Sequence, residues 1–101
     1  MVVIFEVIPI GTGTSISDSV AEAVKLVAAS GLDYRLTAMG TIVEGDGDQV
    51  VDLVRACHRK VMEKADRVIT HIMIDDRKGY TARIEGKVKS VEQKIGHPVK
   101  K

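Results

Sequence analysis

The first strand-like stretch of the chain, Val2-Val-Ile-Phe-Glu-Val-Ile-Pro-Ile10, decides its fold. Valine, isoleucine and phenylalanine favour a β-strand, and a proline near its end is typical of a strand end or an edge position. Because successive side chains point to opposite faces, Val3, Phe5 and Val7 share one face, while Glu6 shares the other with aliphatic residues. Both faces are largely apolar, so we expect both to be covered.

The rest of the chain alternates between segments with helical spacing of apolar residues and segments rich in β-branched residues. Glycine-rich or acidic loops separate them and supply caps. The expected elements are a helix that starts near Ser15 or Ser17 and stops at Gly31, short strands at Tyr34–Ala38 and Thr41–Glu44, a helix capped by Asp46 or Asp48, a strand at Arg67–Asp75, and a short helix from Ile84 to Ile95 that ends at Gly96.

This order predicts an α+β fold, a ferredoxin-like βαββαβ sandwich with an antiparallel four-stranded sheet and an extra C-terminal helix. Right-handed crossovers place the first and third strands at the centre. The two crossover helices cover only one face of the sheet, and the other would be a large exposed apolar patch. We therefore predict a single domain over residues 1–101 that forms a homodimer or homotetramer through the sheet. The terminal helix is the alternative cover.

Composition excludes several classes of protein. The 101 residues carry 15 Lys+Arg against 14 Asp+Glu, whereas domains that bind duplex nucleic acid are strongly basic. Aromatic residues make up 3% of the chain, which leaves little for base stacking. The apolar runs are too short for a bilayer, no basic segment precedes them, and the single cysteine fits a reducing compartment. We expect a cytoplasmic protein that binds neither nucleic acid nor membranes.

The sequence offers little for catalysis, metal binding or cofactor binding. Cys57 and His58 are adjacent on a predicted helix, so their side chains diverge by about 100° and cannot act on each other. The histidines and the cysteine lack the spacing of a metal site. Gly11-Thr-Gly-Thr-Ser15 precedes a helix as phosphate loops do, but it lacks the third glycine of a dinucleotide fingerprint and the Gly-Lys-Ser/Thr ending. We interpret it as a turn, and we expect no catalytic residue, metal or cofactor.

Candidate ligand-binding residues lie on the predicted strands. Glu6 stands between aliphatic residues on a central strand, where a carboxylate needs a partner. The partner of Glu6 is either a charged group of another subunit, water, or the amine of a ligand. His71 on the last strand could also approach Glu6 if the register between the two strands brings them together. Thr41 and Glu44 lie on the short strands beside the turn that contains Met39, where polar groups combine with a flexible apolar side chain.

Four segments resemble the thiamine-binding, YkoF-like superfamily, and more narrowly its short single-domain branch. They are Pro9-Ile-Gly-Thr-Gly-Thr-Ser-Ile-Ser17, Leu36-Thr-Ala-Met-Gly-Thr-Ile-Val-Glu-Gly45, Ile74-Asp-Asp-Arg77 and Lys87-Val-Lys-Ser-Val91. The likeness covers almost the whole chain. It implies a ferredoxin-like subunit, dimers and tetramers assembled through the sheets and, as in some members of the family, binding of thiamine or its hydroxymethylpyrimidine part. The residues that match are Ser15, Met39, Thr41 and Glu44, to which Glu6 and His71 are our additions.

The leading interpretation is a non-catalytic, homo-oligomeric binding protein for thiamine or hydroxymethylpyrimidine. An aminopyrimidine offers an amine donor and ring acceptors that carboxylate and hydroxyl groups can meet. Two alternatives stay open. One is an oligomeric regulatory module that senses another small metabolite or an anion, and the other is an enzyme whose active site forms between subunits.

Overall fold

The computed structural model describes residues 1–11 and 17–101, and the predicted order of elements is confirmed. The bounds are β1 (Val2–Ile10), α1 (Ser17–Ala29), β2 (Asp33–Thr37), β3 (Gly40–Glu44), α2 (Gly47–Met62), β4 (Arg67–Asp75) and α3 (Arg83–Ile95). The predicted cap at Ser15 lies outside the described residues. No helix in the described part of the chain is both long and apolar enough to cross a membrane.

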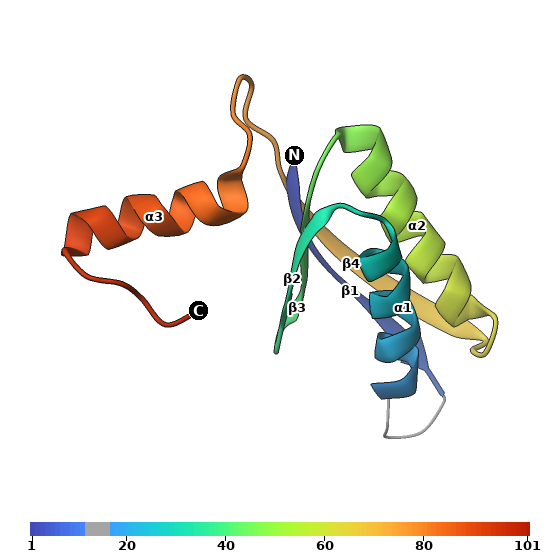
Figure 1. Cartoon of the computed structure of the whole chain (residues 1–101). Coiled ribbons are helices and arrows are strands. Elements are labelled where there is room, and N and C mark those ends of the chain that lie inside the picture. Colours follow the sequence, from blue (N-terminus) through green and yellow to red (C-terminus); the bar gives the residue numbers. More distant parts are fainter. Residues whose placement is uncertain (12–16) are drawn as a thin grey trace.

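The four strands form one antiparallel sheet in the order β2-β3-β1-β4 (Figure 1). The first and third strands are therefore central, as the crossover rule predicts. β1 pairs with β4 along its whole length, from Val2 opposite Asp75 to Ile10 opposite Arg67. This long register fixes which side chains of the two strands are neighbours on each face.

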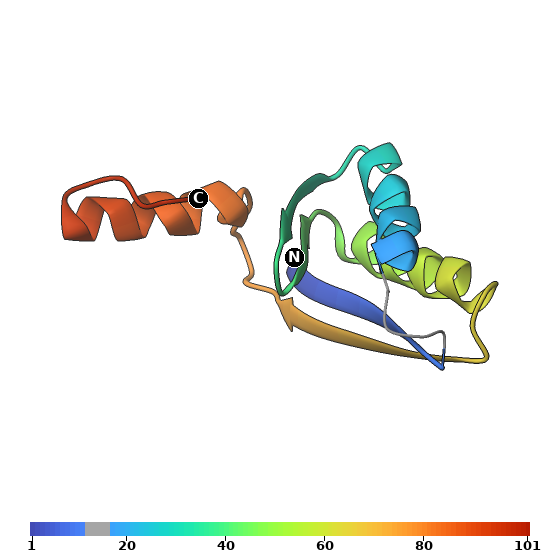
Figure 2. The ribbon, with the colours of Figure 1, turned by 90° about the horizontal axis from the view of Figure 1, so that it is seen from below.

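Helices α1 and α2 lie together on one face of the sheet (Figure 2). We call this face the covered face. The core forms between it and the apolar stripes of the two helices. Its buried hydrophobic residues are Val3, Phe5, Val7, Ala23, Val27, Val43, Val50, Leu53, Val54, Cys57 and Val61. Burial of this apolar surface is the main force that holds sheet and helices together.

Local signals position the helices as the sequence predicts. The Asp46 side chain accepts a hydrogen bond of 3.0 Å from the Asp48 amide and caps α2. Gly31 has a φ of 77°, a left-handed conformation that ends the α1 segment without a side-chain penalty. Within the core, the Cys57 thiol donates to the Ala23 carbonyl at 3.6 Å and links the two helices.

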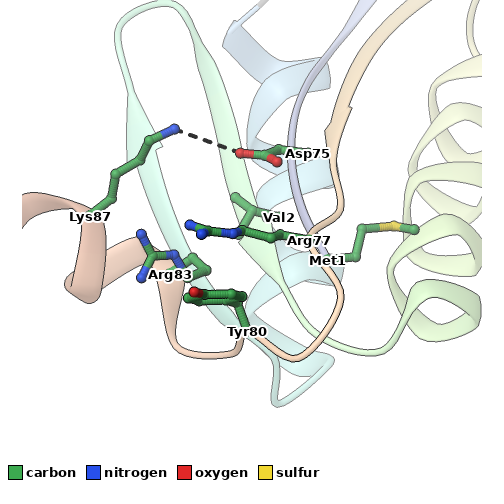
Figure 3. A pocket seen from close by; sticks show the side chains of 7 residues that line it. All are labelled: Met1, Val2, Asp75, Arg77, Tyr80, Arg83 and Lys87. Atoms are coloured by element: carbon green, nitrogen blue, oxygen red, sulfur yellow. Dashed lines mark ion pairs between the residues drawn. The ribbon is translucent and has the colours of Figure 1, made fainter.

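Helix α3 does not pack on the sandwich but extends away from it (Figures 1 and 2). None of its residues is buried. Its N-terminal half is tied to the sheet by polar contacts, among them an ion pair of 3.6 Å between Lys87 Nζ and Asp75 Oδ2 (Figure 3). The sheet face opposite α1 and α2 is therefore left without a helix from its own chain. From the sequence, either a second subunit or the terminal helix is expected to cover this face, and the terminal helix does not cover it.

Candidate ligand-binding site

The uncovered side of the sheet carries a largely apolar surface, which we call the open face. It follows from the strand register and the alternation of side chains. Its apolar members are Val2, Ile4, Ile8 and Ile10 of β1, Ile42 of β3, and Ile69 and Met73 of β4. Met73 is 62% exposed and Ile69 44% exposed. Contiguous exposed apolar residues of this kind mark binding or association surfaces.

Glu6 and His71 lie directly opposite each other on the open face, in neighbouring strands β1 and β4. Both side chains are exposed, and neither forms a hydrogen bond or ion pair within residues 1–11 and 17–101. Side chains opposite each other in an antiparallel pair have Cβ atoms about 5 Å apart. The structure therefore brings together the two residues whose proximity the sequence could not decide, and it leaves their polar atoms available to a ligand.

Thr41 lies on the other side of the sheet. It pairs in register with Phe5 on the covered face, and it is 7% exposed. Its hydroxyl is therefore separated from Glu6 by the thickness of the sheet. The structure does not bring these two candidate residues together.

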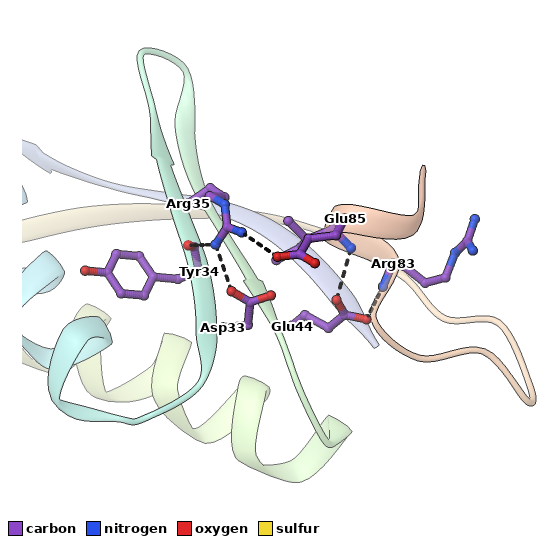
Figure 4. A network of polar contacts seen from close by, with 7 residues as sticks. Asp33, Tyr34, Arg35, Glu44, Arg83 and Glu85 are labelled. Atoms are coloured by element: carbon purple, nitrogen blue, oxygen red, sulfur yellow. Dashed lines mark hydrogen bonds and ion pairs between the residues drawn. The ribbon is translucent and has the colours of Figure 1, made fainter. Parts of the chain in front are cut away.

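Glu44 binds the start of α3 (Figure 4). Its carboxylate oxygens Oε2 and Oε1 accept hydrogen bonds from the backbone amides of Arg83 at 2.7 Å and Ile84 at 3.0 Å. The N-cap residue Ala82 is left-handed, with a φ of 54°, and provides no side-chain cap. Glu44 therefore satisfies two of the free amides at this helix N-terminus, where a negative charge is also favoured by the helix dipole.

A cavity of about 560 Å³ adjoins Glu44, and its wall contains three aspartates, each of which has a partner in the protein. Asp33 pairs with Arg35 at 2.8 Å (Figure 4), Asp46 caps α2, and Asp76 lies 3.9 Å from the Met1 ammonium. The carboxylates here hold chain segments together. A role in ligand binding for Glu44 stays a prediction.

Met39 occupies the tight turn between β2 and β3. The Thr37 hydroxyl accepts from the Met39 amide at 3.2 Å and donates to the Gly40 carbonyl at 2.7 Å, which fixes the turn. The Met39 side chain is 80% exposed and contributes nothing to the core. Ser15, the remaining candidate, lies outside the described residues.

Sequence reasoning missed a basic corner, defined by Arg77, Tyr80, Arg83 and Lys87, where the loop after β4 leads into α3. These residues line a cavity of about 150 Å³. Arg77 and Lys87 belong to segments that resemble the thiamine-binding superfamily, but neither of them is assigned to a binding site from the sequence. The spacing Arg77-x-x-Tyr80-x-x-Arg83 was the available signal, but only the tertiary structure shows that the chain folds both arginines onto the tyrosine. No group of three or more potential metal ligands occurs in the described residues.

Comparison with known proteins agrees with this architecture. The model of the family described as thiamine-binding protein matches residues 3–92. A UPF0045 protein encoded in the glkA 3' region of Staphylococcus xylosus is 42% identical over 93 residues, which cover 86% of this chain and 87% of that protein.

Two solved structures share the fold. The crystal structure of the hypothetical protein MJ1052 from Methanocaldococcus jannaschii has a TM-score of 0.85 at 34% identity and covers 91% of this chain and 95% of that one. The crystal structure of a "putative thiamine biosynthesis/salvage protein", TM0486 from Thermotoga maritima, has a TM-score of 0.78 at 24% identity and covers 89% and 96%. The second likeness concerns the fold alone. The chain therefore belongs to the thiamine-binding protein family, whose model spans nearly all of its residues.

Proposed function

We propose that this protein binds thiamine or its hydroxymethylpyrimidine part without transforming it, as a homo-oligomer in the cytoplasm. The observation that carries the proposal is the opposition of Glu6 and His71 within an apolar sheet surface. Membership of the thiamine-binding family supports the class of ligand. Association of two copies through the same surface would cover its apolar residues.

The chemistry of an aminopyrimidine matches the centre of the open face. The Glu6 carboxylate accepts a hydrogen bond from the exocyclic amine, and an imidazole N–H of His71 donates to a ring nitrogen. Ile4 and Ile8 flank Glu6 on its strand, and Met73 lies beside them on β4. They offer the apolar contact that the flat ring requires.

A second copy of the chain supplies the other wall of this site. The open face alone is a surface rather than a pocket, and small ligands bind where most of their area is buried. Helix α3 adds further unpartnered apolar residues, because Val91 and Ile95 are each 47% exposed. Association through the open face would bury this surface and enclose the ligand between subunits.

The buried cysteine supports binding rather than covalent catalysis. Cys57 is fully buried in the core, and desolvation raises the pKa of its thiol to about 11. The thiol is therefore protonated at neutral pH, whereas the thiolate is the nucleophilic form. The neighbouring His58 imidazole points to another element, since its Nδ1 shares a hydrogen bond with the Thr70 hydroxyl.

Calorimetric titration tests this proposal. Wild-type protein is titrated with thiamine and with hydroxymethylpyrimidine, beside Glu6→Gln and a control, Asp52→Asn, whose carboxylate is 74% exposed on α2. We expect Glu6→Gln to weaken binding about 10- to 100-fold, because it removes a charged hydrogen-bond acceptor worth about 1.5–3 kcal/mol. The control should bind like the wild type.

Light scattering on the same samples should show an unchanged oligomer, so that the loss is assigned to the ligand contact. Absence of heat and of any thermal shift at millimolar ligand would reject thiamine and hydroxymethylpyrimidine as ligands. Equal affinity of Glu6→Gln and wild type would remove Glu6 from the site.

A further inference from the structure

The basic corner lies at one end of the open face, where β1 begins and β4 ends. Its cavity is bordered by Met1 and by Val2 and Asp75, and the last two face each other at the end of the β1–β4 ladder. The remaining wall comes from the loop after β4 and from the first turns of α3 (Figure 3). The cavity therefore collects side chains from three separate segments.

Two arginines of this corner converge on one aromatic ring. The Arg77 guanidinium carbon lies 3.6 Å from the centroid of Tyr80, and that of Arg83 lies 5.5 Å from it (Figure 3). Both are within the range of cation–π attraction, which holds the guanidinium groups near each other despite their like charge. The ring thus acts as a platform for two positive charges.

The charge of the corner is not neutralised by the protein. Lys87 is paired with Asp75 at 3.6 Å, and the Met1 ammonium faces Asp76 at 3.9 Å, so these four charges cancel. Neither arginine side chain forms an ion pair or hydrogen bond within residues 1–11 and 17–101. Two positive charges therefore remain, and a bound dianion would balance them.

The backbone of α3 adds no anion site of its own, because the amides of Arg83 and Ile84 are already bound by Glu44. Recognition in this corner is therefore left to the side chains. Guanidinium groups suit it, since their planar N–H donors match the oxygen spacing of phosphate and bind it bidentately. Tyr80 is half-exposed, and it presents its ring and a hydroxyl donor beside them.

We propose that the basic corner is a phosphate-binding site, in which Arg77 and Arg83 hold a dianionic phosphate group and Tyr80 positions both arginines. The phosphate is either free or the ester end of a small ligand that also contacts the open face. From Val2 to Glu6 the open face runs about 13 Å along β1, the scale of a small phosphate ester. The site stands independently of thiamine binding, because its charges and cavity do not involve Glu6 or His71.

The test is titration of the full chain with inorganic phosphate, at constant ionic strength made up with chloride. The variants are Arg77→Gln, Arg83→Gln and the double variant. The matched control is Arg67→Gln, an exposed arginine at the opposite end of β4. We expect phosphate to bind the wild type and Arg67→Gln equally, each single variant at least tenfold more weakly, and the double variant not measurably. Broadening of the phosphorus NMR signal provides a second readout, and thermal melts verify that each variant is folded.

Two arms distinguish the source of the phosphate group. If thiamine monophosphate binds much more tightly than inorganic phosphate and loses that advantage in Arg83→Gln, the site is supported and the ester end of the ligand occupies it. If both bind equally and both depend on the arginines, the site is supported and free phosphate is its occupant. The proposal is overturned if millimolar phosphate and phosphate esters do not bind the wild type. It is equally overturned if the arginine variants bind phosphate like the control.

Discussion

The two faces of the sheet are both largely apolar, but only one of them is buried by helices of the same chain. On the covered face, Val3, Phe5 and Val43 are at most 3% exposed beneath the helices. On the open face, Val2, Ile4 and Ile42 of the same two strands remain partly accessible, and Met73 of β4 is 62% exposed. Alternate residues of one strand therefore lie either in the core, which the chain's own helices cover, or on the open face, which no helix of the same chain covers. The open face is also the one that carries Glu6 and His71.

The largest effect is expected on the covered face. Phe5→Ala removes a 3%-exposed ring from the core and should lower the free energy of unfolding by about 3–5 kcal/mol, independently of protein concentration. Ile4→Ala, its neighbour on the open face, should cost less in dilute solution and more as concentration rises. Urea unfolding at several protein concentrations measures both. Equal, concentration-independent losses would contradict the distinction between the faces.

The next effect concerns association through the open face. Met73→Lys places a charge in the middle of the apolar surface, and it should dissociate the oligomer because a buried unpaired charge is costly. Ala21→Lys, on the exposed side of α1, is the matched control and should leave the assembly intact. Analytical ultracentrifugation at micromolar concentration distinguishes them. A wild type that sediments as a stable single subunit would leave the open face without the cover we propose.

A smaller effect is expected where α3 joins the sheet. Glu44→Ala frees the amides of Arg83 and Ile84, and it should speed their hydrogen exchange and cost about 1 kcal/mol, as for other helix caps. Glu85→Ala removes only an exposed ion pair of 3.4 Å with Arg35 and should change exchange little. If the two variants behaved alike, Glu44 would not be the anchor of α3.

A pH dependence is also expected from the covered face. Burial raises the pKa of the Cys57 thiol from 9.0 to about 11, so the folded state keeps its proton where the unfolded chain loses it. Stability from this source is complete below pH 9 and declines as the pH rises from 9 toward 11, by at most about 1 kcal/mol per pH unit. Urea midpoints at pH 8 and pH 10 should fall more for wild type than for Cys57→Ala. Identical falls would show that the thiol ionises freely in the folded state.

The sequence predicted the elements well, because their signals are local. The β1 and β4 bounds agree with the predicted ones, and Asp46 and Gly31 mark helix ends as expected. The pattern of β1 also predicted that two helices would leave one apolar face uncovered. Each of these features depends on residues close together in the chain, where spacing is enough to infer geometry.

The relative positions of the candidate site residues could be predicted only in part, because these residues come from distant segments of the chain. Whether Glu6 meets His71 depends on a register between strands 65 positions apart, which no local spacing reveals. Thr41 was assigned to the site because it is polar and near a turn, but its strand turns it toward the core. Glu44 was grouped with it; its carboxylate accepts from the backbone amides of Arg83 and Ile84, and its role in ligand binding stays a prediction.

The sequence by itself determined which residues alternate, which segments are helical and that both sides of the sheet are apolar. Only the tertiary structure decided that α3 extends away, that Glu6 faces His71, and that Arg77 and Arg83 gather on Tyr80. The physical reason is the range of the interactions. Propensities and caps act within a few residues, whereas strand register and the attachment of α3 depend on contacts such as that between Glu44 and Arg83, 39 residues apart in the chain.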